Sequence, residues 1–216
     1  VISFQRVEFA LLAMEQLINN AAKLHYITGG RHSVPLVVRA VVGRGWGQGP
    51  EHSQSLETLF AHIPGLKVIM PAYPIDAKRL LQGAVEDPNP VVCIEHRWCH
   101  YVSGHVPEEY SPEALDGPRT LSTGRDVTLV ATSYMTLEAV RAAAALEALG
   151  YSADVIDLRV LRPLKLESIL ASVRKTGRLV TVDTGFRTLG IGAEIVSEVV
   201  GHCFGELRSA PRRIGL

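Results

Sequence analysis

The sequence predicts an α/β protein of two three-layer domains, each with a mainly parallel sheet covered by helices. Short apolar runs alternate with helical patterns over residues 1–102, and a second alternation of the same kind runs over residues 126–216. Such alternation is typical of parallel sheets, because a crossover helix must connect each strand to the next. Between them, residues 103–125 carry breakers such as Pro107 and Pro112 without any periodicity, so we expect a linker there.

The first domain is expected to contain strands and helices in succession. Four apolar residues at three- and four-residue spacing, Ala10, Met14, Leu17 and Ala21, predict a helix over residues 8–23. The other expected elements are strands at 1–4, 36–42, 66–70 and 91–94 and helices at 54–62 and 76–85.

The second domain follows the same logic. An alanine-rich pattern over residues 136–149, ended by Gly150, predicts its longest helix. The other expected elements are strands at 127–131, 153–157 and 179–182 and helices at 166–173 and 191–200. The chain enters its first strand midway and stops without a capping helix, so we expect further residues at both ends.

Composition excludes several classes of function. Lysine plus arginine equals aspartate plus glutamate, 22 each, which gives no support for nucleic acid or an anionic membrane as the main partner. The three cysteines, Cys93, Cys99 and Cys203, form no CxxC pair and predict neither a zinc site nor a disulfide framework, so a cytoplasmic location is expected. No apolar run approaches the roughly 18–20 residues that span a bilayer.

The most informative segment is a glycine-rich loop, residues 43–49, followed by Pro50 and His52. It comes directly after a predicted strand, where open α/β sheets bind their ligands. Its glycines do not fit the dinucleotide fingerprint and no Walker lysine is present, so a phosphate cradle is weakly supported and a plain strand-to-helix connection stays open. His52 is the best candidate for proton transfer, although a lone histidine can also be structural.

Other candidate residues are weaker. Phe9 is expected in the core of its helix, or else as an aromatic face that stacks a flat heterocycle. His96 and His100 flank Trp98 after a predicted strand and either line the same cleft or make surface contacts. No histidine pair has metal-ligand spacing with a carboxylate, so no metal site is expected in this chain.

Several motifs in order carry a resemblance to a known family. The helix from Phe9 to Lys23, the turn Thr28-Gly29-Gly30, the loop from Gly49 to Ser55 and the segment Pro64-Gly65-Leu66-Lys67-Val68 come first. The later motifs are Asp87-Pro88-Asn89-Pro90, Ile94-Glu95-His96, Val155-Ile156-Asp157-Leu158-Arg159 and Lys175-Thr176-Gly177-Arg178-Leu179-Val180. Together they resemble the beta subunit of the thiamine-diphosphate-dependent 2-oxo acid dehydrogenases, of the pyruvate and branched-chain type, over nearly the whole chain.

The resemblance implies a function and a set of partners. It implies a pyrimidine-binding domain and a transketolase C-terminal-like domain, in an α2β2 assembly whose alpha subunit supplies the diphosphate and Mg2+ site. Phe9 matches the aromatic residue that stacks on the aminopyrimidine of thiamine diphosphate, and His52 matches the active-site histidine. The implied reaction is oxidative decarboxylation of a 2-oxo acid with acyl transfer to a lipoyl domain, and K+ orders strand ends in some members.

The sequence departs from the family at three places. The glutamate that activates the aminopyrimidine lies upstream of this sequence, Arg6 stands where the family often has an apolar or aromatic residue, and Asp183-Thr184-Gly185 stands where two acidic residues are common. Rival functions are an acetoin dehydrogenase, a transketolase-like enzyme acting on sugar phosphates, or a non-catalytic beta-like scaffold. Only Arg44 and Arg97 are candidates for the basic residues that a sugar phosphate needs, which favours the 2-oxo acid.

Overall fold

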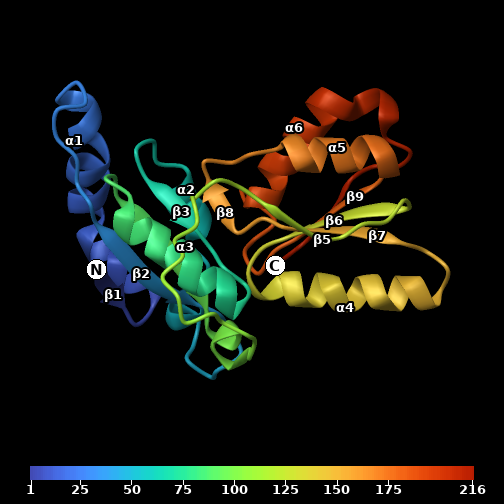
Figure 1. The fold of residues 1–216 in the computed structure, drawn as a ribbon, viewed down its shortest axis with the longest axis horizontal. Helices are drawn as coiled ribbons and strands as arrows, with labels where there is room; N and C mark the ends of the chain where they lie inside the picture. Colours follow the sequence, from blue (N-terminus) through green and yellow to red (C-terminus); the bar gives the residue numbers. More distant parts are fainter. The chain divides into compact units, whose positions relative to one another are not determined.

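The computed structural model describes residues 1–216 as two compact units (Figure 1). The first unit comprises Val1–Asp116 and Val160–Pro163, and the second comprises Gly117–Arg159 and Leu164–Leu216. The chain therefore leaves the second unit for four residues and returns to it. No helix combines the length and the apolar character that crossing a bilayer requires.

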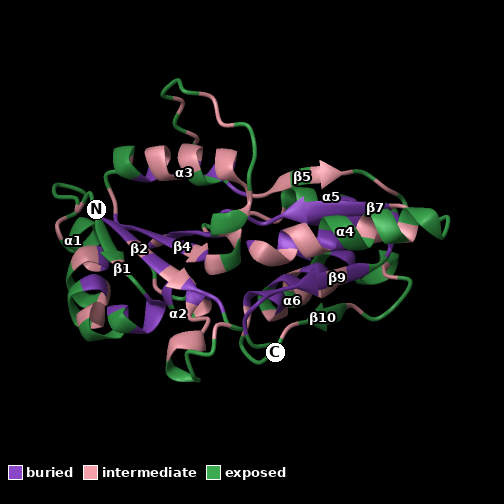
Figure 2. Ribbon diagram, turned by 90° about the horizontal axis from the view of Figure 1, so that it is seen from below, coloured by how far each residue is buried: buried purple, intermediate pink, exposed green.

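The first unit contains a five-stranded sheet in the order β1-β2-β4-β3-β8. Four strands are parallel: β1 (Ile2–Phe4), β2 (Val37–Val42), β4 (Val91–His96) and β3 (Lys67–Ile69). The edge strand β8 (Val160–Arg162) runs antiparallel to β3. The central strand β4 is buried apart from Glu95, whereas the edge strand β1 is largely exposed (Figure 2), and this burial explains the apolar run Val91–Ile94.

Three short helices and one long one follow β2 in the first unit. They are 3₁₀ helices at Glu51–Ser53 and Arg97–Tyr101, α2 (Glu57–Ala61) and α3 (Pro74–Glu86). Leu80 and Ala84 of α3 pack into a core cluster with Val37, Ile69 and Val160. Two apolar residues four apart on α3 thus attach the helix to the sheet.

The helix expected over residues 8–23 is longer and less regular than predicted. A 3₁₀ helix at Val7–Ala13 and a π-helical segment at Gln16–Ala21 lead into α1 (Ala22–Ile27). The buried residues explain the irregularity, because Val7 and Ala10 are three apart whereas Leu17 and Ala22 are five apart. Those spacings equal the separations of the i→i+3 and i→i+5 hydrogen bonds that define 3₁₀ and π turns.

The second unit is a three-layer sandwich around a sheet in the order β10-β9-β6-β7-β5. Its parallel strands are β6 (Val127–Ala131), β7 (Ala153–Asp157), β9 (Leu179–Val182) and β10 (Arg212–Ile214), and its helices are α4 (Tyr134–Ala148), α5 (Glu167–Thr176) and α6 (Ile191–Cys203). A 3₁₀ turn, Phe204–Glu206, follows α6. Figure 1 shows α4 on one face of this sheet and α5 with α6 on the other. The predicted α/β class with mainly parallel sheets is confirmed.

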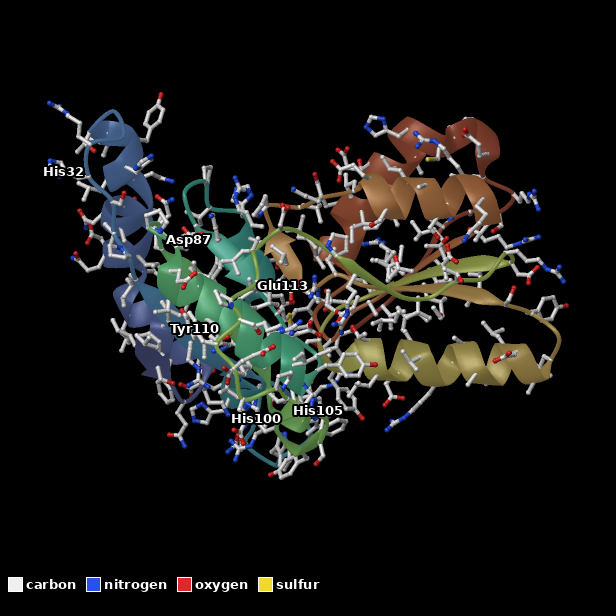
Figure 3. The ribbon with its side chains drawn as sticks, in the orientation of Figure 1. His32, Asp87, His100, His105, Tyr110 and Glu113 are labelled. Carbon is white, nitrogen blue, oxygen red and sulfur yellow. The ribbon has the colours of Figure 1, made fainter.

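The segment expected as a linker, residues 103–125, is more structured than its sequence indicated. Its end forms β5 (Arg119–Ser122), which pairs antiparallel with β7. Its middle lies along α3, where Tyr110 donates a hydrogen bond to Glu86 and the backbone N–H of Glu113 donates to the carbonyl of Arg79 (2.8 and 3.1 Å; Figure 3). Prolines in this stretch block helix formation but allow extended chain that bonds to neighbouring elements.

Candidate functional site

The topology of the first sheet brings the candidate residues to one edge. Strands β1, β2 and β4 are neighbours and parallel, so their carboxyl ends at Phe4, Val42 and His96 lie side by side. The segments that follow these ends carry Glu8 and Phe9, the glycine-rich loop with His52, and the aromatic residues after β4. This is the edge where open α/β sheets bind ligands.

His52 is held by a carboxylate from the first segment. Its Nδ1 forms a hydrogen bond with Oε1 of Glu8, which lies in the 3₁₀ helix Val7–Ala13. The Glu8 side chain is only 6% exposed, whereas 36% of the His52 side chain is exposed. The other Glu8 oxygen, Oε2, is buried and has no hydrogen-bond partner. The imidazole is therefore anchored at one nitrogen while part of its ring faces solvent.

Phe9 lies beside the same imidazole. The ring centroids of Phe9 and His52 are 5.5 Å apart and their planes are inclined by 43°. Phe9 is 42% exposed, which is unusual for an aromatic side chain that neighbours a core-facing helix turn. The structure thus brings together the two residues that the sequence singled out, and leaves an aromatic surface accessible next to the His52 imidazole.

Arg6 ties the glycine-rich loop to the first segment. It is 3% exposed, its Nη1 donates to the carbonyl of Gly43 (3.1 Å) and its Nη2 donates to Oε1 of Gln48. Its Nε is buried without a partner. Burial and the nearby Arg97 cation lower the pKa of Arg6. The contacts span about 40 residues of sequence and restrain the loop that carries His52.

His96 is buried beneath the start of this loop. The backbone N–H of Trp98 donates to its Nδ1 (3.3 Å), and a Cβ on Gly43 would lie 3.3 Å from its ring, so glycine with φ of +125° is required there. Burial, and after it the charges of Arg44, His100 and Arg6, lower the pKa of His96 to about 4. The His96 ring is therefore neutral at neutral pH and supports the loop from below.

An aromatic cluster formed by Trp46, Trp98 and Tyr101 adjoins the loop. Trp46 stacks on Tyr101 with centroids 6.0 Å apart and meets Trp98 edge-on at 6.3 Å. The guanidinium of Arg97 lies 5.2 Å above the Trp46 ring, at cation–π distance. His100, labelled in Figure 3, is 3.3 Å from Glu95 and half exposed, so it is a surface contact.

From the sequence, Glu8 was not singled out as a site residue, and Arg6 was noted only as a departure from the family pattern. Both are charged residues in an otherwise apolar stretch next to Phe9, and that pattern was the available signal. Their partners, Gly43, Gln48 and His52, are too distant in sequence for the contacts to be read from local spacing.

The first unit also contains a groove that is lined by none of the candidate residues. This groove of about 570 Å³ is lined partly by Lys67, Asp87 and Glu113, and Lys67 forms an ion pair with Asp87 there (Figure 3). No group of three or more histidine, cysteine, aspartate or glutamate side chains is arranged to hold a metal ion.

Comparison with known families identifies both units. Residues 1–99 match the transketolase pyrimidine binding domain, and residues 118–216 match the transketolase C-terminal domain.

Individual relatives agree with these assignments. The chain is 42% identical to the mitochondrial pyruvate dehydrogenase E1 component subunit beta of Pisum sativum, covering 100% of this chain and 61% of that protein. It is 40% identical to the pyruvate dehydrogenase E1 component subunit beta of Rhizobium meliloti (94% and 45% covered). It is 39% identical to the acetoin:2,6-dichlorophenolindophenol oxidoreductase subunit beta of Cupriavidus necator (94% and 60% covered).

A solved structure is also similar. A split gene transketolase, described as an inactive beta4 tetramer, superimposes with a TM-score of 0.75 at 28% identity, covering 99% of this chain and 65% of that one. The chain spans between 45% and 63% of the length of the curated relatives named here and their neighbours in similarity.

Proposed function

Because this chain belongs to the transketolase-like family, with a pyrimidine-binding domain followed by a C-terminal domain, we propose that it acts as the beta subunit of a thiamine-diphosphate-dependent 2-oxo acid dehydrogenase. One observation carries the proposal: His52, anchored by Glu8, lies beside the exposed Phe9 ring at the carboxyl edge of the sheet. The names of the relatives in Pisum sativum and Rhizobium meliloti support the same reaction class.

The residues present fit the pyrimidine half of thiamine diphosphate. The exposed face of Phe9 offers a stacking surface for a flat heterocycle, and the buried, unpartnered Glu8 Oε2 offers a hydrogen-bond acceptor nearby. When bound, thiamine diphosphate supplies the nucleophilic carbon and the electron sink for decarboxylation. The proposal assigns the diphosphate and Mg2+ to an alpha subunit.

His52 has a defined role in this scheme. Its Nδ1 is occupied by Glu8, so Nε2 is the nitrogen available to a substrate. Once Nε2 has taken up a proton, His52 donates a hydrogen bond from it to the substrate oxygen that gains negative charge, and then transfers this proton as the acyl group leaves for lipoamide. Arg6, by holding Gly43 and Gln48, keeps the loop in the geometry that this transfer needs.

The remaining parts of the proposal concern partners and location. An alpha subunit, in an α2β2 heterotetramer, completes the cofactor site, and a lipoyl domain receives the acyl group. K+ and a cytoplasmic location belong to the same proposal, although the Pisum sativum relative is named as mitochondrial.

An activity assay tests the proposal. The full-length protein is co-expressed with its alpha partner and supplied with thiamine diphosphate, Mg2+ and ferricyanide, together with a panel of 2-oxo acids. We expect turnover that needs both chains and that falls about 10²- to 10⁴-fold in His52→Ala, because a positioned proton donor is lost.

The matched control is His32→Ala. His32 lies on the exposed turn after α1 (Figure 3) and its substitution should leave kcat unchanged. Absence of turnover with every 2-oxo acid, in a heteromer that assembles and binds the cofactor, would refute the proposal.

A second candidate is a transketolase-like reaction on sugar phosphates. It is favoured by three arginines at this edge, Arg6, Arg44 and Arg97, because their cations lower the pKa of neighbouring basic groups, and this positive charge would attract a phosphate. Sugar phosphates therefore belong in the same substrate panel. Turnover of a sugar phosphate that exceeds turnover of every 2-oxo acid would favour this candidate.

A further inference from the structure

We propose that Glu8 is a positioning residue that fixes the tautomer and orientation of the His52 imidazole. This inference rests on the proposed function, because that function assigns His52 a proton-transfer role. It goes further by naming the residue that prepares the His52 imidazole for this role. The observation behind it is the hydrogen bond between Glu8 Oε1 and His52 Nδ1.

The hydrogen bond with Glu8 gives the two ring nitrogens of His52 different roles. In a neutral imidazole one nitrogen carries the proton and the other is an acceptor. An ionised carboxylate can only accept, so its bond makes Nδ1 the protonated nitrogen and leaves Nε2 free to take a proton. When Nε2 takes that proton, the adjacent carboxylate stabilises the imidazolium that results, as the buried aspartate does in serine hydrolases.

Burial makes the Glu8 carboxylate depend on its partners. Its side chain is 6% exposed, and removing a carboxylate from water is unfavourable unless a partner compensates. Arg6 lies two residues away and is also buried, yet its hydrogen bonds go to Gly43 and Gln48. Glu8 Oε1 is therefore directed to His52, and the buried arginine contributes only a favourable electrostatic field to the carboxylate.

The orientation of the His52 ring depends on the same hydrogen bond. His52 lies in a three-residue 3₁₀ helix that follows a glycine-rich loop, and such a short helix does not fix a side chain by itself. The Glu8 bond and the Phe9 ring, 5.5 Å away, are the contacts that define the imidazole plane. Loss of the bond would leave the imidazole free to rotate on a partly exposed site.

The unpartnered Oε2 atom of Glu8 also supports a role for this carboxylate at the ligand site. This buried carboxylate oxygen has no hydrogen-bond donor within the chain, whereas buried polar atoms usually have one. A donor on a bound ligand would satisfy Oε2 without disturbing Oε1, so Glu8 can orient His52 and contact the ligand together.

Nitrogen-15 NMR of the His52 side chain tests the inference without any turnover. The full-length protein, assembled with its alpha partner and labelled at histidine, is compared with Glu8→Gln, Glu8→Asp and the control Glu15→Gln. Glu15 is an exposed glutamate of the same helical stretch whose carboxylate bonds to Gln16 and Asn20. We expect the Nδ1-protonated tautomer in the unsubstituted protein and in Glu15→Gln, its loss in Glu8→Gln, and partial retention in Glu8→Asp.

Steady-state kinetics supplies the second readout. Loss of the hydrogen-bond partner that orients a functional histidine reduces activity about 10- to 100-fold. We expect a fall of this size in kcat for Glu8→Gln with KM changed by less than about threefold, because the interaction matters mainly as charge develops.

Each outcome decides a separate question. A His52 ring that is protonated at Nε2 in the unsubstituted protein, or a tautomer that does not respond to Glu8→Gln, overturns the inference, as does full kcat in that variant. If no substrate is turned over but the tautomer follows Glu8, the proposed function fails and the positioning role stands.

Discussion

At the scale of single residues, His96 links the site to the pH dependence of stability. Its pKa is lowered from 6.5 to about 4, first by burial and then by Arg44, His100 and Arg6. Between pH 6.5 and pH 4, His96 is therefore protonated in the unfolded chain but not in the folded chain. The free energy of unfolding consequently falls as the pH drops through this range. Between pH 7.5 and pH 5 this group removes about 2 kcal/mol from the free energy of unfolding.

Urea unfolding followed by tryptophan fluorescence measures this effect, because Trp46 and Trp98 both lie in the first unit. His96→Gln, which is neutral at both pH values, should lose about 2 kcal/mol less than the unsubstituted protein on going from pH 7.5 to pH 5. Equal pH dependence of the free energy of unfolding in the two proteins would show that folding does not lower the pKa of His96.

The residues of the candidate site were predictable to different degrees. His52 and Phe9 stand out because a histidine follows a glycine loop and because the family resemblance assigns both. Glu8 and Arg6 do not, since their importance comes from burial next to partners 37 to 44 residues away. Local sequence shows residue type and spacing, whereas burial of a charge depends on the tertiary fold.

At the scale of elements, the helices were predicted best where one face is apolar at regular spacing. α3, α4 and α6 each lie within three residues of the expected ends. The stretch Val7–Ile27 was predicted less well, because its buried residues follow three- and five-residue spacings instead of one regular period. Short edge strands such as β5 and β10 were missed because three or four residues, none of them buried, carry almost no periodic signal.

Helix α3 supplies a prediction about close packing. Gly83 lies in its interior, and a Cβ there would be 2.0 Å from the carbonyl oxygen of Glu113. Alanine normally favours a helix over glycine by about 1 kcal/mol. At Gly83 the backbone of the crossing segment must shift, and such overpacking costs about 1–3 kcal/mol, so we expect Gly83→Ala to lower the free energy of unfolding by about 2 kcal/mol.

Gly201 in α6 is the matched control, because a Cβ there meets nothing within 4 Å. Gly201→Ala should raise the free energy of unfolding by about 1 kcal/mol. Circular dichroism in urea measures both variants. Stabilisation by Gly83→Ala would mean that the segment around Glu113 is not held against α3.

At the scale of the whole molecule, the division of the chain was the least predictable feature. A contiguous domain, a linker and a second domain were expected from the positions of prolines and glycines. The structure instead gives the first unit a strand, β8, that comes from residues 160–163, between two parts of the second unit. Nothing in the composition of Val160, Leu161 and Arg162 indicates which sheet they join.

This division predicts that residues 1–116 are incomplete as a folding unit. Val160 and Leu161 are at most 2% exposed, Val160 belongs to the core cluster of the first unit, and β3 becomes an open edge when β8 is absent. Loss of two buried aliphatic side chains removes about 3–6 kcal/mol, and an open edge strand favours aggregation. We expect residues 1–116 alone to aggregate or unfold without cooperativity in urea, measured by light scattering and tryptophan fluorescence.

Restoring the strand is the decisive comparison. Residues 158–164, fused to residues 1–116 through a flexible glycine-serine linker, should return cooperative unfolding and a monodisperse species, because the pairing of Ile69 with Val160 is regained. The same fusion carrying Val160→Thr keeps the shape of the side chain but buries a hydroxyl, and should recover less stability. If residues 1–116 unfold at the same urea concentration with and without the fused strand, β8 contributes nothing to the first unit, and its stability resides entirely in the contiguous part of the chain.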